Sequence, residues 1–100
     1  MKLNVSIDKE LEELIPGYLN NRKNEVRQLA DCLAEGNFEG IRFIAHGLKG
    51  TGSGYGFDFI SELGSELENK ALEVDVEKLS EYIEDLSYFL ENVEVIYVEG

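Results

Sequence analysis

Apolar side chains recur every three or four residues over most of the chain, which is the spacing of one face of an α-helix. The pattern first predicts a short helix capped by Asp8. A second helix follows, with Pro16 in its first turn and its end at Gly36. The expected inward positions of this second helix are Leu19, Val26, Leu29, Ala30 and Leu33.

Three further helices follow in the same pattern. Asn37 is the expected cap of the third helix, and the fourth begins near Phe57 or Asp58 and ends near Leu72. Asp75 caps the last helix, which the pattern makes the longest. Gly64 in the fourth helix allows a close crossing with a neighbour. The inward positions are Ile41, Ile44, Ala45, Leu48, Gly52 and Tyr55 in the third helix, Ile60, Leu63, Leu67 and Ala71 in the fourth, and Leu79, Tyr82, Ile83, Leu86, Leu90 and Val93 in the last.

The connections between these helices are only a few residues long, so successive helices should run antiparallel. The fold class expected is therefore all-α, an antiparallel up-down four-helix bundle with a short additional N-terminal helix. With 100 residues the chain is long enough for one hydrophobic core and too short for two. Residues 1–100 are expected to form a single helical domain, in which only the extreme termini are free to be flexible.

Two segments fit a purely helical chain less well. Residues 49–56 contain four glycines, and each costs about 1 kcal/mol relative to alanine inside a helix. Either tertiary packing carries the third helix through them, or that helix ends early. A phosphate-cradling glycine loop is a weak alternative, because such loops follow a strand. The β-branched tail at residues 93–98 fits an extended segment or a continued helix, and both remain open.

The charge of the chain limits its partners. There are 21 acidic residues against 9 basic ones, giving a formal net charge of −12. This charge repels phosphates, so neither a nucleic acid nor a membrane is expected as partner, and a protein is. The single cysteine, Cys32, excludes an internal disulfide and is expected to be a small buried residue in a reducing compartment. With no secretory or membrane-spanning run, we expect a cytoplasmic monomer, or a cytoplasmic piece of something larger.

Candidate chemistry centres on His46, the only histidine of the chain. Lys49 and Gly50 follow it by three and four residues, so an imidazole, an ammonium group and a position without a side chain share one side of the helix. Such a surface can present the imidazole to something bulky and anionic. We call this predicted exposed surface the His46 face, and its residues are Glu39, Arg42, Phe43, His46, Lys49, Gly50 and Ser53.

The stretch over residues 44–68 resembles the signature of the histidine-containing phosphotransfer (HPt) domain. The matching elements are His46, Leu48-Lys49-Gly50, the small residues at 51–54, Gly56, Ile60, Leu63, Leu67 and Glu68. The flanks are also similar, with Asp8, Pro16 and Gly36-Asn37 at the places of the family's cap, proline and break. The resemblance covers nearly the whole chain. It departs at Gly47, where the family usually has a longer side chain, and in the number of glycines at residues 50–56.

The resemblance implies a phosphorelay intermediate without autonomous kinase activity. Nε2 of His46 would accept a phosphoryl group from a receiver-domain aspartate, or from a histidine kinase, and pass it to another receiver. Imidazole suits this role because its ordinary pKa of about 6.5 leaves it neutral near pH 7. Lys49 would offset the incoming negative charge, and Glu68 would accept a hydrogen bond from the other ring nitrogen. No cofactor is expected on this chain, and Mg²⁺ would belong to the receiver.

Docking of the receiver is expected at Arg42, Phe43, Gly50 and Ser53, with Gly50 leaving room for the receiver's loops. Phe43 could instead belong to the core. A dimerising histidine-kinase helix pair is disfavoured, because it typically has an acidic residue directly after the histidine and needs an ATP-binding domain. A helical interaction module without phosphorylation remains the alternative. A metal site is remote, since one histidine and one cysteine on different helices do not close one.

Overall fold

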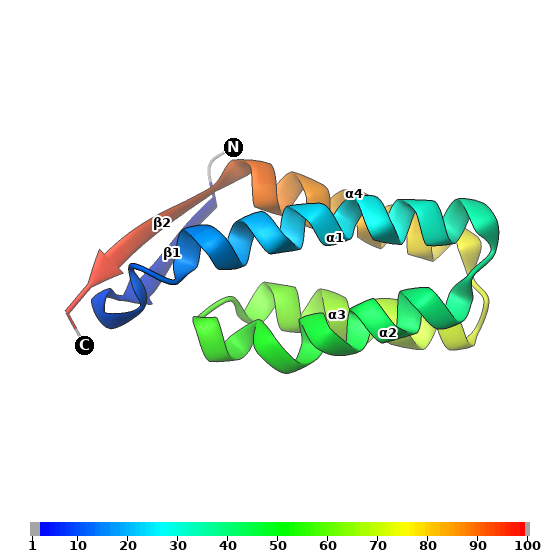
Figure 1. Ribbon diagram of the computed structural model, residues 1–100, viewed down its shortest axis with the longest axis horizontal. Helices are drawn as coiled ribbons and strands as arrows, with labels where there is room; N and C mark the ends of the chain where they lie inside the picture. Colours follow the sequence, from blue (N-terminus) through cyan, green and yellow to red (C-terminus); the bar gives the residue numbers. More distant parts are fainter. Residues whose placement is uncertain (1–2, 100) are drawn as a thin grey trace.

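The computed structural model describes residues 3–99 and contains four helices and a small sheet at one end (Figure 1). The helices are α1 (Ile15–Glu35), α2 (Phe38–Thr51), α3 (Asp58–Leu72) and α4 (Val76–Asn92). They run alternately in opposite directions, and α2 and α4 each contact both α1 and α3. The predicted antiparallel four-helix bundle is therefore confirmed. No helix formed by residues 3–99 is long and apolar enough to cross a membrane.

The helix ends lie where the polar breaks predict them. Asp8, Asn37 and Asp75 each accept a backbone hydrogen bond that a helix start would otherwise leave unpaired. Gly36 ends α1 in the left-handed conformation, with φ of 69°, and Pro16 lies in the first turn of that helix. The capping distances to the backbone nitrogens of Glu10, Gly40 and Lys78 are 2.9, 2.9 and 3.1 Å.

The core runs the length of the bundle and takes side chains from every helix. All four inward positions predicted for α3 are buried. The prediction was wrong for Ala30 of α1, which is exposed because it lies about 100° around the helix from the buried Leu29. Cys32, expected to be buried, is half-buried. The longest helix is α1 with 21 residues, and not α4 with 17, because α4 ends at Asn92 and the chain continues from Val93 in an extended conformation.

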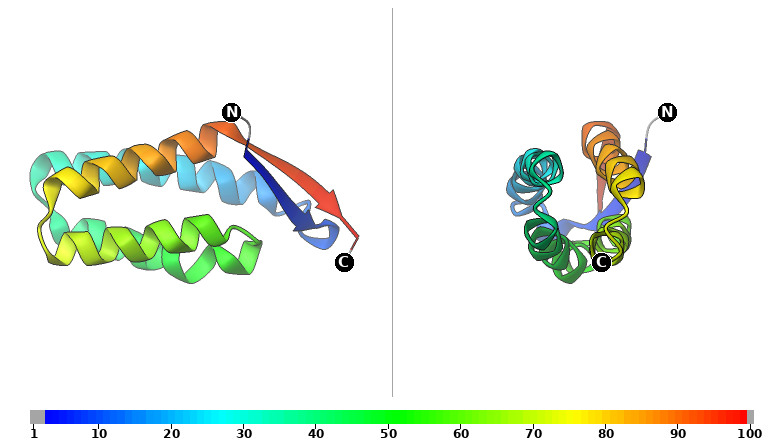
Figure 2. Two further views of the ribbon diagram at one scale, coloured as in Figure 1. Left: turned by 180° about the vertical axis from the view of Figure 1, so that it is seen from behind. Right: turned by 90° about the vertical axis from the view of Figure 1, so that its right-hand side faces the viewer.

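A two-stranded parallel sheet joins the two ends of the chain, and the sequence pattern missed its first strand. β1 (Leu3–Asp8) pairs with β2 (Val93–Val98) along their full length, from Leu3 opposite Val93 to Asp8 opposite Val98. The tail that could be extended or helical is thus extended. Figure 2 shows the sheet at the end of the bundle where α1 begins and α4 ends. The predicted short N-terminal helix is one 3-10 turn, η1 (Lys9–Leu11), directly after β1.

The glycine-rich stretch after α2 ends that helix early. α2 stops at Thr51, and a second 3-10 turn, η2 (Ser53–Tyr55), leads to Gly56, which has φ of 92°. Ser53 and Tyr55, expected on the third helix, therefore lie beyond its end. The reason is packing at Gly52, where a Cβ atom would lie 2.6 Å from the backbone nitrogen of Ser61. The chain can turn back into α3 this tightly only without a side chain there.

Candidate functional site

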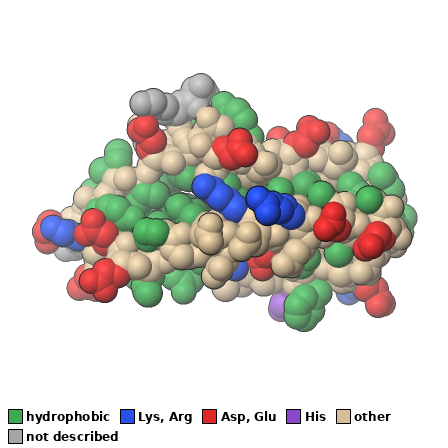
Figure 3. All heavy atoms as spheres, turned by 45° about the horizontal axis from the view of Figure 1, so that its top comes forward, with side chains coloured by type: hydrophobic (Ala, Val, Ile, Leu, Met, Phe, Trp, Pro, Cys, Tyr) green, Lys and Arg blue, Asp and Glu red, His purple; other side chains and the backbone are tan. Residues whose placement is uncertain are grey.

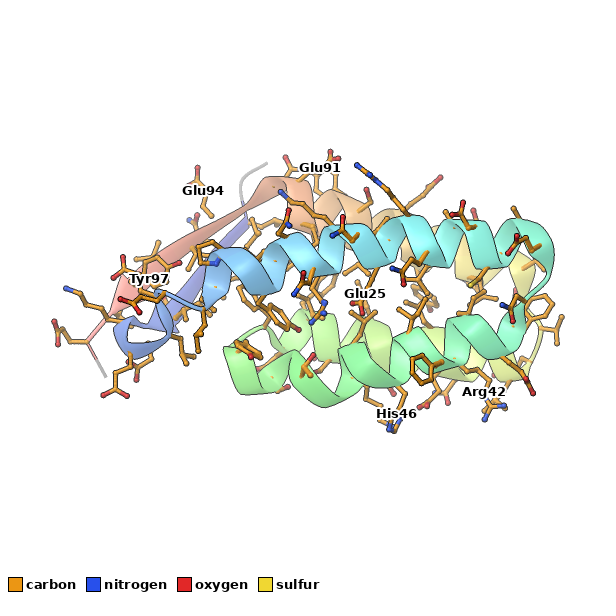
Figure 4. The ribbon with its side chains drawn as sticks, viewed as in Figure 1. Glu25, Arg42, His46, Glu91, Glu94 and Tyr97 are labelled. Carbon is orange, nitrogen blue, oxygen red and sulfur yellow. The ribbon has the colours of Figure 1, made fainter. Side chains whose placement is uncertain are left out.

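His46 lies on the outer side of α2, where its side chain is 77 % exposed. Figure 4 shows its ring and the side chain of Arg42 pointing away from the bundle. The space-filling view shows the histidine at the edge of the molecule, next to a protruding hydrophobic side chain (Figure 3). The predicted exposure of the His46 face is observed, since each of its seven residues is exposed.

A carboxylate from the neighbouring helix holds one side of the ring. Oε2 of Glu68, on α3, lies 3.3 Å from Nδ1 of His46. Its second oxygen, Oε1, accepts a hydrogen bond of 3.3 Å from Nζ of Lys49. The structure therefore brings together the three residues singled out for the chemistry. It adds one feature that the sequence did not predict, because the Lys49 ammonium group is bound to Glu68 rather than free.

The contact with Glu68 distinguishes the two ring nitrogens of His46. It favours the tautomer in which Nδ1 carries the proton and donates it to the carboxylate. The lone pair of the neutral ring is then on Nε2. Within residues 3–99 no group forms a hydrogen bond with Nε2. The nitrogen available to an incoming electrophile is thus the one without a hydrogen-bond partner among the described residues.

The charge on Glu68 is stabilised by its two partners. The hydrogen bond from Lys49 is the main reason that the pKa of Glu68 lies below its ordinary value. Desolvation acts in the opposite direction, and the positive charge of Lys49 and the contact with His46 add to the lowering. Glu68 is consequently an acceptor, and not a donor, at neutral pH.

Close contact between α2 and α3 sets these distances. A Cβ atom on Gly64 of α3 would lie 2.5 Å from the backbone nitrogen of Lys49 and 2.8 Å from the carbonyl oxygen of Ala45. The close crossing predicted at Gly64 is confirmed, and Glu68 follows one turn later on the same side of α3. Ser61 adds a polar link, because its hydroxyl donates to the Lys49 carbonyl at 3.0 Å. The same hydroxyl accepts a 2.8 Å hydrogen bond from the backbone nitrogen of Ser53.

The residues expected to dock a partner surround His46. Arg42 and Phe43 lie one turn before it and line an open depression together with Glu39, His46 and Glu68. Phe43 is 83 % exposed, so the alternative that it belongs to the core is wrong. Gly50 is exposed, and a Cβ atom there would meet no atom within 4 Å. Its lack of a side chain is therefore not required by internal packing.

Comparison with known proteins agrees with this geometry. The model of the Hpt domain family matches residues 9–94. The chain belongs to the Hpt family. Hpt domains are helical bundles that serve as phosphotransfer intermediates, not kinases, in two-component signalling, and they interact with receiver domains and kinases. No curated protein and no solved structure gives a significant match. Strand β1 and most of β2 lie outside the matched residues.

Two residues that sequence reasoning missed fix the end of α2 in this Hpt domain. The hydroxyl of Thr51 donates to the carbonyl of Gly47 at 2.8 Å, one turn back along the helix. The hydroxyl of Tyr18, on α1, lies 3.1 Å from that of Thr51. The tyrosine ring stacks on Tyr55 with 4.3 Å between centroids. The only signal for this anchor was the buried helical position of Tyr18, three residues after Ile15.

Proposed function

We propose that this Hpt domain is a phosphorelay intermediate in which Nε2 of His46 carries the phosphoryl group. Nε2 attacks the phosphorus of an aspartyl phosphate on a receiver domain, the bond from phosphorus to the carboxylate oxygen breaks, and its electrons return to the aspartate. The reverse reaction on a second receiver frees the histidine. A histidine kinase is the other possible source of the phosphoryl group, and the domain has no kinase activity of its own.

The observation that carries the proposal is the asymmetry of the His46 ring. One nitrogen is held by Glu68 at 3.3 Å, and the ring as a whole is 77 % exposed. An ordinary surface histidine has no reason to be fixed in one tautomer by a carboxylate of another helix. Here the contact supports orientation of Nε2 outward as a neutral nucleophile, with Glu68 as a positioning residue.

Lys49 supports the proposal through its charge. A phosphoryl group brings about 1.5 to 2 negative charges at neutral pH. The Lys49 side chain is half-exposed and lies one turn from His46, where its ammonium group has three donors. One donor holds Glu68, which leaves two for phosphoryl oxygens. Charge-assisted hydrogen bonds of this kind are stronger than neutral ones.

We propose further that the receiver docks on the His46 face, through Arg42, Phe43, Gly50 and Ser53. Phe43 offers an exposed apolar contact beside the reacting nitrogen, and Gly50 leaves space for the receiver's active-site loops. The receiver brings its own Mg²⁺, and this chain needs no cofactor. Residues 1–100 act as one cytoplasmic domain and as a monomer.

Transfer of radioactive phosphate from a purified phosphorylated receiver tests the proposal. We expect acid-labile label on the wild-type protein and none on His46→Gln. The exposed position of residue 46 predicts an unchanged circular dichroism spectrum and a stability within about 0.5 kcal/mol of wild type. Wild-type labelling of His46→Gln would contradict the assignment of the phosphorylated residue. Label only with a kinase domain and ATP would indicate a kinase substrate, and no label at all would indicate an interaction module.

A further inference from the structure

The proposed relay requires His46 to give up its phosphoryl group as well as accept it. Attack by Nε2 while Nδ1 carries a proton produces a phosphorylated ring with a positive charge. If Nδ1 then loses its proton to solvent, the ring is neutral, and breaking the N–P bond would expel an imidazole anion. An anion of that basicity is a poor leaving group. The ring donates its phosphoryl group readily only while Nδ1 remains protonated.

The charged groups around the ring decide whether that proton stays. On α2, Arg42 and Lys49 are cations on the same side as His46, and both disfavour a positive ring. Glu39, also on α2, lines the depression beside the ring. On α3, Glu68 is the carboxylate in contact with the ring, through Nδ1 itself. Its side chain is only 21 % exposed and is held on its other oxygen by Lys49.

We infer that Glu68 keeps the Nδ1 proton on phosphorylated His46 and thereby keeps the phosphoryl group transferable. This rests on the proposed function and adds to it, because orientation of the neutral ring concerns acceptance, whereas retention of the proton concerns donation. The receiver carboxylate attacks phosphorus, the N–P bond breaks, and its electron pair returns to Nε2. The ring leaves as neutral imidazole, with its Nδ1 proton still shared with Glu68. No proton enters or leaves during either transfer.

Glu68→Gln tests the inference, because an amide oxygen still accepts a hydrogen bond from Nδ1–H but carries no charge. The full chain is phosphorylated with phosphoramidate, a small N–P donor that needs no receiver. At pH 8 we expect transfer from phosphorylated Glu68→Gln to a receiver to be about threefold slower than from wild type, the size typical of an ion pair in which one partner, here the 77 % exposed His46 ring, is in contact with solvent. At pH 5.5 Nδ1 of phosphorylated His46 takes its proton from solvent in both proteins, so the difference between their transfer rates should shrink.

Nitrogen NMR gives a direct readout, because the chain has one histidine. In the phosphorylated protein at pH 8, we expect the Nδ1 signal of the wild type to show more of the protonated form than that of Glu68→Gln. Glu66→Gln is the matched control, since it removes the same charge from an exposed position on the same helix. It should behave as wild type.

Release of Lys49 is the competing explanation for a slower Glu68→Gln, because a free ammonium group would stabilise the phosphoryl group. Comparison of Lys49→Met with Lys49→Met/Glu68→Gln removes that effect, and the slowing should persist in this pair. Equal rates in the pair, or equal Nδ1 signals in wild type and Glu68→Gln, would overturn the inference while leaving the relay intact. Failure of the wild type to take label on His46 would instead overturn the proposed function.

Discussion

Two glutamates on opposite sides of the bundle each pair with a cation, and their pKa values move in opposite directions. Glu25 of α1 lies on the inner side of its helix (Figure 4), in an ion pair with Arg22 in which Nε and Oε1 are 2.6 Å apart. Burial raises the pKa of Glu25, and this outweighs the lowering by Arg22. The Glu68 side chain is no more exposed, at 21 % against 25 % for Glu25, but its partner Lys49 is 50 % exposed whereas Arg22 is 14 % exposed. The hydrogen bond from Lys49 lowers the pKa of Glu68.

The difference follows from the kind of packing in the two halves of the bundle. α2 and α3 touch backbone to backbone at Gly64, so the polar groups near the crossing emerge directly at the surface. α1 meets its neighbours through side chains, of which Ile15, Tyr18 and Leu29 are buried. A charged pair on the inner side of α1 is thereby partly desolvated. Close contact of α2 and α3 thus gives a carboxylate whose cationic partner reaches solvent, whereas both members of the pair on α1 are largely covered.

Removing the close contact should have the largest effect on stability. Gly64→Ala places a methyl group against two backbone atoms, so we expect the free energy of unfolding to fall by about 3 kcal/mol in urea titrations. The Nδ1 signal of His46 should also change, because α3 can relieve the clash only by moving Glu68. Gly47→Ala, on the open side of α2, is the control and should stabilise by about 0.5 kcal/mol. Equal stability of the two variants would mean that the helices are not in close contact.

The next largest loss of stability should come from removing Arg22, the cation that pairs with Glu25. Arg22→Met leaves the Glu25 carboxylate half-buried without its partner, at a cost of about 1–2 kcal/mol at pH 7. The pKa of Glu25 in the folded protein should rise further, because Arg22 lowers it. A folded-state pKa above the unfolded value weakens the fold as pH rises through it, so the deficit should diminish toward acid pH. Arg22→Met/Glu25→Leu should recover the loss at pH 7. The Arg22 guanidinium also lies 4.5 Å from the centroid of the Tyr18 ring, so a deficit independent of pH would assign the effect to the loss of that contact.

A side chain at Gly50 should affect the partner more than the fold. Since nothing lies near its Cβ position, Gly50→Leu should leave stability unchanged or raise it by about 0.5 kcal/mol. Phosphoryl transfer from a receiver should slow, because a branched side chain would stand one turn from the imidazole. Gly50→Ala adds only a single methyl group, so its transfer rate should lie between those of wild type and Gly50→Leu. Unchanged transfer rates in both variants would show that the receiver does not approach this part of α2.

In the unphosphorylated protein the smallest change should be the one confined to the Glu68 carboxyl group. Lys49→Met removes the main cause of the lowered pKa of Glu68, so this pKa should rise toward its ordinary value. Carbon NMR of the side-chain carboxyl over an acid titration measures it. The stability that ionised Glu68 contributes is present above its unfolded pKa and is lost as pH falls through the folded one. In Lys49→Met this loss should be smaller and should be complete at higher pH. If the pKa of Glu68 were the same in Lys49→Met and in wild type, the contact between Lys49 and Glu68 would not be kept in solution.

Local signals predicted most of the helical frame. Asp8, Asn37, Asp75 and Gly36 are capping residues whose effect depends only on their neighbours in sequence, and all four act as expected. The predicted burial of Ala30 was wrong because alanine has little preference for burial and this one lies beside the strongly buried Leu29. The sequence does not determine the end of α2, because glycine propensity argues for a break, whereas packing at Gly52 decides where the break occurs.

The site was only partly accessible to the same reasoning. The spacing of His46, Lys49 and Gly50 predicted one exposed surface, and the family resemblance supplied Glu68. The bond between Lys49 and Glu68 joins two helices, and no spacing along one helix predicts it. The Ser61 link and the contact of Thr51 with Tyr18 were missed for the same reason, since each joins residues that only the folded backbone brings near.

The pairing of β1 with β2 has a consequence for how the chain folds. Each residue of β1 lies opposite the residue 90 positions later, so the sheet joins segments that are far apart in the sequence. Contacts of such long sequence separation are slow to form, whereas turns between successive helices form early. The helices should therefore assemble before the strands meet, and mutations in β1 should mainly speed unfolding rather than slow folding. In amide hydrogen exchange the strands should open first, as a unit, while the helix that presents His46 remains protected.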